Sequence, residues 1–140
     1  DDFSLGLDPG YRRLFVDYLR DYARSENKTV FLTSHIIQDM ERLIDDCIIM
    51  DYGSILIQQP IETLMKGLRK YTCTVPEGYQ PQLPVTCYHP AVIRQTLETY
   101  SFLPPSDVEG LLKENQVPFT GLQHENVGLE DAFIGLTGKY

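Results

Sequence analysis

The sequence has little of what several classes of protein require. Lysine and arginine number 12 against 20 acidic residues, which gives the 140-residue chain a formal net charge of -8. A chain of this charge offers no basic face to a phosphate backbone, so we expect no nucleic-acid partner. No apolar run reaches the roughly 20 residues that a membrane-spanning helix needs. We therefore expect any link to a membrane to run through a partner.

Cysteine and histidine are also scarce. The cysteines, Cys47, Cys73 and Cys87, are widely spaced and form no CxxC pair. This spacing argues against a zinc site and a disulfide framework, and it fits a reducing cytosol. Cys47 and Cys73 lie in apolar runs, where a thiol behaves as a small inert hydrophobe. Two histidines, His89 and His124, have no partners at the spacing of metal ligands, so we interpret them as surface or core residues.

The first half of the chain alternates helical and strand patterns. Asp8 and Pro9 precede an apolar stripe that predicts an amphipathic helix over 11–24, with Asp8 as its cap. Apolar runs at 29–33 and 47–50 do not alternate with polar residues, which is typical of strands buried on both faces of a parallel sheet. The other elements expected here are a helix over 37–46, a turn at 51–54, a returning strand at 55–57 and a helix over 60–69.

The second half begins near Lys70, where the pattern changes. We place a domain boundary there, between residues 1–68 and 70–140. The later elements expected are strands at 71–75, 83–88 and 117–122, helices at 91–100 and 107–114, and a closing amphipathic helix with Leu129, Phe133 and Leu136 on one face. Ser106 and Glu109 are spaced as a capping box for the second of these helices. The whole order predicts an α/β fold followed by a small α/β accessory domain.

The opening residues carry the most specific motif. Residues 1–9 read D-D-F-S-L-G-L-D-P, which resembles the junction of the Walker B motif and the D-loop in ABC-type ATPases, commonly D-E-P-x-x-G-L-D-P. Residues 33–35 (T-S-H) resemble the switch histidine of that family, directly after an apolar run. Glu41, Asp46 and Gly53 follow in a stretch that also resembles the family.

The closing residues point to the same family. Residues 129–138 read L-E-D-A-F-I-G-L-T-G, which resembles the L-E-D-x-F-x-x-L-T-G ending of many bacterial ABC export-type ATPase subunits. The resemblance implies that residues 1–68 are the C-terminal part of a P-loop NTPase sheet with flanking helices. It also implies that ATP and Mg²⁺ are the cofactors of the full-length parent.

The resemblance assigns roles to four residues. Asp1 would hold Mg²⁺ through water, because Mg²⁺ is a hard cation that keeps most of its waters. Asp2 stands where the family usually has the longer Glu, and it would orient or deprotonate the attacking water. His35 would contact the γ-phosphate as a hydrogen-bond donor and act in catalysis with Asp2. Asp8 would contribute to nucleotide binding across a dimer interface.

Two motifs of the family do not occur in the sequence. It contains no Walker A loop and no L-S-G-G-Q-like signature, and both normally precede the Walker B motif. We therefore expect this chain alone to be inactive and to bind ATP poorly, while the parent hydrolyses ATP to drive transport. The expected partners are a transmembrane permease and a second, head-to-tail ATPase subunit. The expected location is cytoplasmic, on the inner face of the cell membrane.

Alternatives to these roles stay open. Residues 70–140 fit a regulatory or dimerisation module, which would make the chain a binding module rather than an enzyme. A self-contained hydrolase using His35 with Asp1 or Asp2 is a further alternative, although no nucleophile or metal set accompanies them. Asp8 fits a helix cap as well as a catalytic role, and the two are compatible. Asp1 and Asp2 also fit a solvated terminus.

Overall fold

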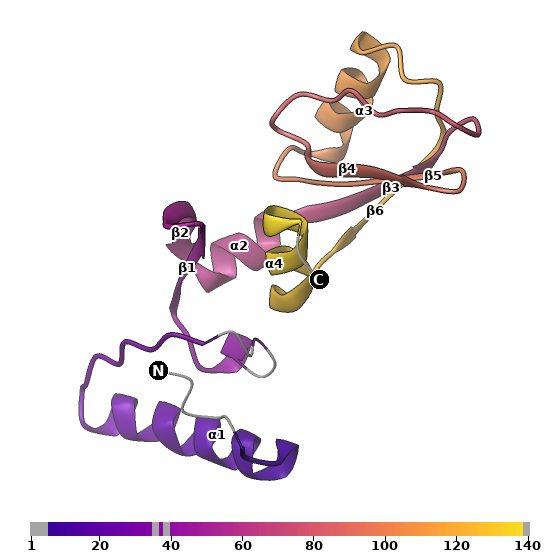
Figure 1. Ribbon diagram of the computed structural model, residues 1–140. Coiled ribbons are helices and arrows are strands. Elements are labelled where there is room, and N and C mark those ends of the chain that lie inside the picture. The colour runs from indigo at the N-terminus through magenta and orange to yellow at the C-terminus, as the bar shows by residue number, and fades with distance from the viewer. Residues whose placement is uncertain (1–5, 35–36, 38–39, 139–140) are drawn as a thin grey trace.

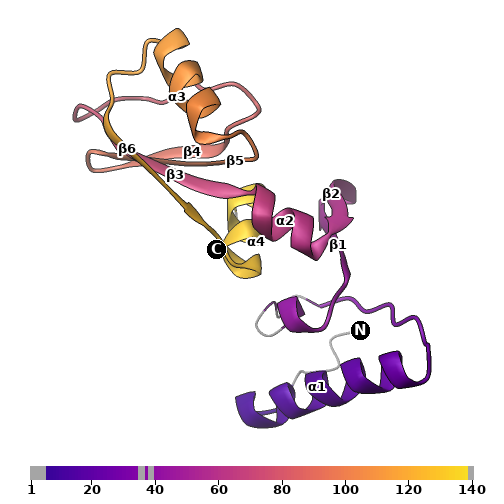
Figure 2. The same cartoon turned by 180° about the vertical axis from the view of Figure 1, so that it is seen from behind.

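The first helix forms from signals that lie beside it in the sequence. The computed structural model describes residues 6–34, 37 and 40–138, and α1 spans Pro9–Ser25. Pro9 occupies the first turn, where a missing N–H costs nothing, and the Asp8 side chain caps the free amides. The predicted helix and its cap are confirmed. Figure 1 and Figure 2 show α1 at one end of the molecule, away from both sheets.

The chain after α1 departs from the predicted order. Residues 29–33 form no strand, so that prediction is wrong. A strand needs hydrogen-bonded neighbours, and within the described residues no strand pairs with this run, leaving Phe31 84% exposed. The helix predicted over 37–46 is shorter than expected, since its described part holds only the 3-10 turn η1, Met40–Arg42.

A small hairpin follows, as the sequence predicts. Strand β1 (Asp46–Asp51) pairs antiparallel with β2 (Ser54–Pro60) through a two-residue turn at Tyr52 and Gly53. Both turn residues have positive φ, 44° and 79°, the geometry that suits a tight hairpin. Only alternate residues of β1 are buried, so the expectation of a strand buried on both faces is wrong. Its pairing partner is antiparallel rather than parallel.

Helix α2 (Ile61–Gly67) leads directly into a four-stranded antiparallel sheet. The strand order in this sheet is β4-β5-β3-β6, so the sheet joins segments that are far apart in sequence. The bounds of the strands are Arg69–Thr74 for β3, Tyr88–Ile93 for β4, Thr96–Ser101 for β5 and Thr120–Asn126 for β6. The predicted strand at 71–75 is confirmed, and the one at 117–122 forms a few residues later than expected.

Strands β4 and β5 replace a predicted helix. The helix over 91–100 and the strand over 83–88 are both wrong: the chain from Tyr88 to Ser101 is a hairpin with a two-residue turn. Arg94 opens that turn at φ 58°, and β-branched residues flank it on both strands. Leu97 is 1% exposed and faces the core of the sheet, so burial has decided the structure of this segment.

Helix α3 (Pro105–Glu114) covers one face of the sheet, as both ribbon views show (Figure 1, Figure 2). Its predicted position is confirmed, but the capping box is wrong. The cap position is Pro104, no side chain caps the helix, and Glu109 pairs instead with Lys113 at 2.6 Å. The core beneath α3 consists of Tyr71, Cys73, Val75, Leu97, Val108, Leu112 and Val117.

Helix α4 (Leu129–Thr137) lies on the other side of the sheet, beside α2 (Figure 1, Figure 2). Gly138 ends it in the left-handed conformation, at φ 68°, as is common for a helix C-terminus. This helix packs in a second core that also includes residues of α1, η1, β1, α2 and β5. The buried members are Val16, Met40, Cys47, Ile49, Leu64, Leu68, Tyr100, Val127, Leu129, Ala132 and Leu136.

Candidate functional site

Asp8 is the predicted site residue whose geometry the structure describes. One of its carboxylate oxygens, Oδ1, accepts hydrogen bonds from the backbone N–H groups of Gly10 at 2.9 Å and Tyr11 at 3.2 Å. Its backbone carbonyl accepts the first helical bond, from Arg12 N at 2.9 Å. The side chain is exposed. Because the cap uses a single oxygen, the geometry is compatible with a further contact at the other.

Asp1, Asp2 and His35 lie outside the described residues. Their assignment to Mg²⁺, to the attacking water and to the γ-phosphate therefore stays a prediction. Of the described residues nearest to His35, Ser34 belongs to the irregular segment that follows α1, and Ile37 packs against the second core.

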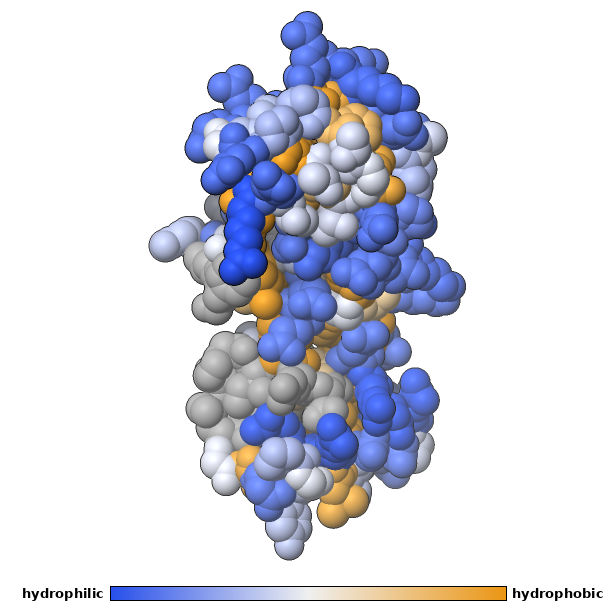
Figure 3. All heavy atoms as spheres, turned by 90° about the vertical axis from the view of Figure 1, so that its right-hand side faces the viewer, coloured by the Kyte–Doolittle hydropathy of each residue, from blue (hydrophilic) through white to orange (hydrophobic). Residues whose placement is uncertain are grey.

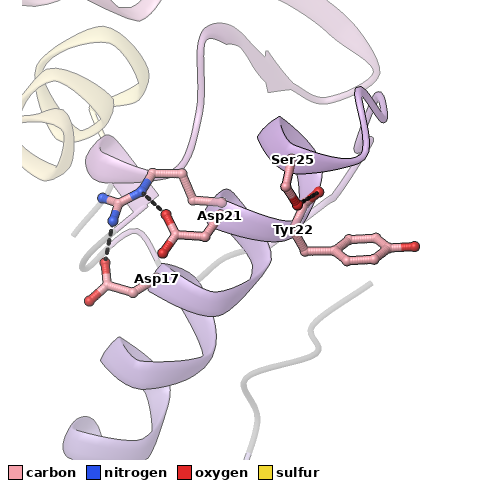
Figure 4. A network of polar contacts seen from close by, with 5 residues as sticks. Asp17, Asp21, Tyr22 and Ser25 are labelled. Atoms are coloured by element: carbon pink, nitrogen blue, oxygen red, sulfur yellow. Dashed lines mark hydrogen bonds and ion pairs between the residues drawn. The ribbon is translucent and has the colours of Figure 1, made fainter.

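The charged face of α1 is an ordinary solvated surface. Figure 4 shows a guanidinium between Asp17 and Asp21, and this group belongs to Arg20, whose Nη2 and Nε each lie 3.4 Å from one carboxylate. Ser25 Oγ donates to the carbonyl of Tyr22 at 3.2 Å. Ion pairs at exposed positions contribute little, about 0–1 kcal/mol, so we assign this cluster no chemistry.

A second surface of α1, beside the charged one, is aromatic and exposed. Tyr11, Leu14 and Tyr18 are 66%, 65% and 67% exposed, and Tyr18 stacks on Tyr22 with ring centroids 6.4 Å apart. In Figure 4 the Tyr22 ring points away from Asp17 and Asp21. Large apolar side chains gathered on one surface typically mark a contact with another polypeptide. In the face shown in Figure 3, the molecule narrows between its lower and upper parts, and apolar residues reach the surface beside the narrowing.

Glu41 makes a contact that its sequence motif does not predict. Its Oε2 accepts a hydrogen bond from the backbone N–H of Leu129 at 3.3 Å, across 88 positions of sequence. Glu41 was assigned only as part of a family motif. Gly128 is the sequence feature that could have indicated this contact. It occupies the cap position of α4 and has no side chain to satisfy the first amides, so an acceptor from elsewhere in the chain is needed.

The buried thiols carry no nucleophilic chemistry. Cys47, Cys73 and Cys87 are all buried and free, and burial raises the pKa of each thiol. A raised pKa keeps the sulfur protonated and unreactive at neutral pH, in line with the prediction for Cys47 and Cys73.

Other binding chemistries find no support within the described ranges. No group of three or more His, Cys, Asp or Glu side chains among residues 6–34, 37 and 40–138 could hold a metal ion. In the same part of the chain, no helix combines the length and the apolar character that crossing a bilayer demands. His89 instead donates from Nε2 to the Leu136 carbonyl at 3.2 Å, and the His124 ring lies 5.9 Å from that of Tyr71.

Lys70 and Glu98 form a polar cluster on the sheet face opposite α3. Lys70 Nζ lies 2.9 Å from Glu98 Oε2, and the Tyr100 hydroxyl donates to Glu98 Oε1 at 3.3 Å. Its hydrogen bond to Glu98 raises the pKa of Lys70, and burial raises the pKa of Tyr100 to about 12. Both groups thus hold their protons at neutral pH, and the cluster is a structural link between β3 and β5.

Known proteins resemble this chain over nearly its whole length. No family model matches it. It is 32% identical over 150 residues to the Nod factor export ATP-binding protein I of Ralstonia nicotianae, an alignment that covers 99% of this chain and 46% of the relative. The protein of the same name from Burkholderia orbicola is 28% identical over 146 residues, with 99% and 46% covered.

A second kind of relative matches half of the chain. The Energy-coupling factor transporter ATP-binding protein EcfA2 of Staphylococcus aureus is 36% identical over 70 residues, which cover 50% of this chain and 24% of that protein. The chain spans a little under half the length of the relatives that it matches from end to end. All of these relatives are named as ATP-binding proteins.

Proposed function

Since this chain is related over nearly its whole length to the ATP-binding proteins of ABC transporters, we propose that it is part of a subunit that hydrolyses ATP to drive transport across a membrane. The observation that carries the proposal is the 32% identity over 99% of the chain. That alignment takes in the two ends of the sequence on which the motifs lie. Neither motif alone would support the proposal as strongly.

The proposed site uses residues suited to MgATP. Carboxylate oxygens are the ligands that Mg²⁺ prefers, and Asp1 would hold the ion through water. Asp2 would orient or deprotonate the attacking water, and His35 would donate a hydrogen bond to the terminal phosphate. Bound MgATP would supply the phosphoryl group and the cation that neutralises its charge. Asp8, whose exposed carboxylate uses one oxygen in the helix cap, would reach across to a second ATPase subunit.

The exposed aromatic surface supports a larger ATP-binding unit. More than half of the surface is exposed in each of four large side chains, those of Tyr11, Leu14, Tyr18 and Phe31. Exposed apolar side chains of this size lower the solubility of an isolated domain. We expect the rest of the ATP-binding unit, including the loop that cradles the phosphates, to cover this surface. Residues 29–33, which form no strand in this chain, would then have strand neighbours.

The partners and the location follow from the proposed function. A transmembrane permease would use the free energy of ATP hydrolysis for transport, and a second ATPase subunit would complete each nucleotide site. The subunit would lie in the cytoplasm, bound to the inner face of the membrane through the permease. Other chains, including the permease, would determine which substrate is transported.

Titration calorimetry with MgATP tests the part played by this chain. We expect the 140-residue chain to give no measurable heat of binding, because no residues in its sequence form a phosphate-cradling loop. The full-length subunit should bind MgATP under the same conditions. Tight binding by the 140-residue chain alone would contradict the proposal.

Replacement of His35 tests the proposed chemistry in the full-length subunit. His35→Ala should abolish turnover while leaving the affinity for ATP largely intact, because the imidazole would act on the terminal phosphate and the water. His124→Ala is the matched control, since its ring lies against Tyr71 in the C-terminal sheet. Equal turnover by the two variants would show that His35 has no part in hydrolysis.

A regulatory role for residues 70–140 is the second candidate. The observation in its favour is that the four-stranded sheet and α3 enclose a core of their own. Such a unit could bind a partner or a second copy and so control the ATPase. Light scattering of the chain over a range of concentrations tests self-association: a mass that stays monomeric throughout would remove the dimerisation form of this candidate.

A further inference from the structure

The amino end of α4 is capped by a residue from elsewhere in the chain. Gly128 occupies the cap position, and no side chain next to it in sequence satisfies the first amides of the helix. Glu41 Oε2 takes this role by accepting a hydrogen bond from Leu129 N at 3.3 Å. A carboxylate suits this place because the unpaired N–H groups give a helix a partial positive charge at its N-terminus.

Apolar packing holds the same two segments together. Met40, next to Glu41, is 4% exposed, and Leu129, whose amide makes the bond, is 7% exposed. Both belong to one core, in which Ala132 of the following turn is fully buried. Leu43 and Ile44 pack against the edge of this core. The segment 40–44 is therefore seated on α4 by buried side chains as well as by one hydrogen bond.

The other side of α4 is fixed to the sheet. A side chain at Gly135 would place its first carbon 2.5 Å from the ring of Tyr100, so the helix lies directly on this ring. At the next residue of the helix, the Leu136 carbonyl accepts a hydrogen bond from His89 Nε2 at 3.2 Å. These contacts leave α4 little freedom to slide, and whatever is bound to its amino end is held relative to the sheet.

We propose that Glu41 is a positioning residue for the nucleotide site: by capping α4 it fixes the segment that follows His35 against the C-terminal sheet. This inference rests on the proposed function, because it is turnover of MgATP that the positioning would support. Glu41 lies six positions after His35 in the sequence. Through this contact, the C-terminal unit sets the position of a segment of the catalytic part.

Hydrogen exchange on the 140-residue chain tests the contact without any nucleotide. Glu41→Ala removes the acceptor, and loss of a helix cap typically costs about 1 kcal/mol, which corresponds to about fivefold faster exchange. We expect this acceleration in amides 129–132 and none in α3. Glu41→Gln keeps an oxygen acceptor and should restore most of the protection. Arg42→Ala, at an exposed residue of the same turn, is the matched control and should leave α4 unchanged.

Steady-state ATP hydrolysis by the full-length subunit tests the positioning. Glu41→Ala should lower kcat by about fivefold or more and leave KM for ATP within about twofold, because Glu41 acts on the segment and not on the nucleotide. Glu41→Gln should recover most of kcat. Because loss of the cap also lowers stability, kcat is compared at equal amounts of folded enzyme, and a fall in kcat that disappears after this correction would contradict the positioning role.

The outcomes separate this inference from the proposed function. Faster exchange at 129–132 with an unchanged kcat would overturn the positioning role and leave the proposed function standing. Unchanged exchange in Glu41→Ala would overturn the contact itself. If the unsubstituted full-length subunit hydrolysed no ATP, the proposed function would fail, and the role of Glu41 would fall with it. Faster exchange together with a rescued loss of kcat is the result that supports the inference.

Discussion

Helix α1 and the C-terminal sheet unit, which consists of strands β3 to β6 and helix α3, differ in how their structures are stabilised. Helix α1 has 17 residues, yet Val16 is its one fully buried side chain. The sheet unit instead closes over a core of seven buried residues, contributed by β3 and the residue after it, by β5, by α3 and by the loop after that helix. The comparison shows that local signals suffice to specify a helix, whereas stability must come from contacts between distant segments.

The two regions also differ in their proposed roles. The motifs assigned to the nucleotide site lie in and around the poorly buried α1, and the core beneath α3 lies within residues 71–117. A surface such as that of Tyr11, Leu14 and Tyr18 gains free energy when another polypeptide covers it. Substitutions in the two regions test this energetic contrast.

The largest effect should come from the core of the sheet unit. Leu112 is 1% exposed beneath α3, so Leu112→Ala should lower the free energy of unfolding by about 2–5 kcal/mol. Leu14→Ala is the matched control on α1, where the side chain is 65% exposed, and it should change stability by about 0.5 kcal/mol or less. Urea unfolding followed by circular dichroism measures both. Equal losses would show that α1 is as well packed as α3.

Substitution of two glycines, one in each of the helices on the two sides of the sheet, tests how closely these helices are packed. Gly135→Ala would push a methyl group into the Tyr100 ring and should destabilise the chain by about 1–3 kcal/mol. Gly110 lies within α3 with nothing near the added carbon, so Gly110→Ala should stabilise by about 0.5–1 kcal/mol. Thermal unfolding distinguishes the two signs. A stabilising Gly135→Ala would mean that α4 does not lie against Tyr100.

Alkaline pH should weaken the sheet unit through Tyr100. Burial raises the pKa of this hydroxyl from 10.0 to about 12, so between these values the unfolded chain releases the proton first and stability falls as pH rises. The pKa of Lys70 is also raised, chiefly by its hydrogen bond to Glu98, and the ion pair is lost in the same direction above pH 10.5. We expect a loss of up to about 2 kcal/mol between pH 10 and 12.

The control for this prediction is a tyrosine outside the core. Tyr100→Phe should flatten the pH dependence of urea unfolding, whereas Tyr52→Phe, at a side chain that is 93% exposed, should leave it unchanged. The two substitutions remove the same hydroxyl, so only its surroundings differ. A slope that survives in Tyr100→Phe would assign the alkaline transition to other groups.

The sequence predicted those elements whose signals are local. Asp8 and Pro9 defined the start of α1, the Tyr52-Gly53 pair defined the first hairpin, and the apolar stripe of residues 129–137 defined α4. Each of these signals acts within one turn of helix or one tight turn of chain. Such signals can be read without knowing what the element packs against.

Elements that depend on distant partners were predicted less well. Residues 91–100 had helical spacing of apolar side chains, but pairing with β3 and burial of Leu97 made them a hairpin. Residues 29–33 had the composition of a strand, but pairing with other strands decides whether one forms. The cap that Glu41 provides for α4 was invisible for the same reason, since it joins residues 88 positions apart. Of the candidate site, the sequence gives residue types and order, and the structure adds the geometry of Asp8.

The smallest effect tests whether α1 depends on local signals as strongly as the comparison suggests. Asp8→Ala removes the acceptor of the bonds from Gly10 and Tyr11, and it should destabilise α1 by about 1 kcal/mol while leaving the sheet unit unaffected. Asp8→Asn retains an acceptor and should behave nearly as the unsubstituted chain. Hydrogen exchange resolves the effect by region: faster exchange should appear in the first turns of α1 and be absent from β3 and β5. Acceleration that spread into the sheet would show that the two regions unfold as one unit, and the contrast between local and distant stabilisation would not hold.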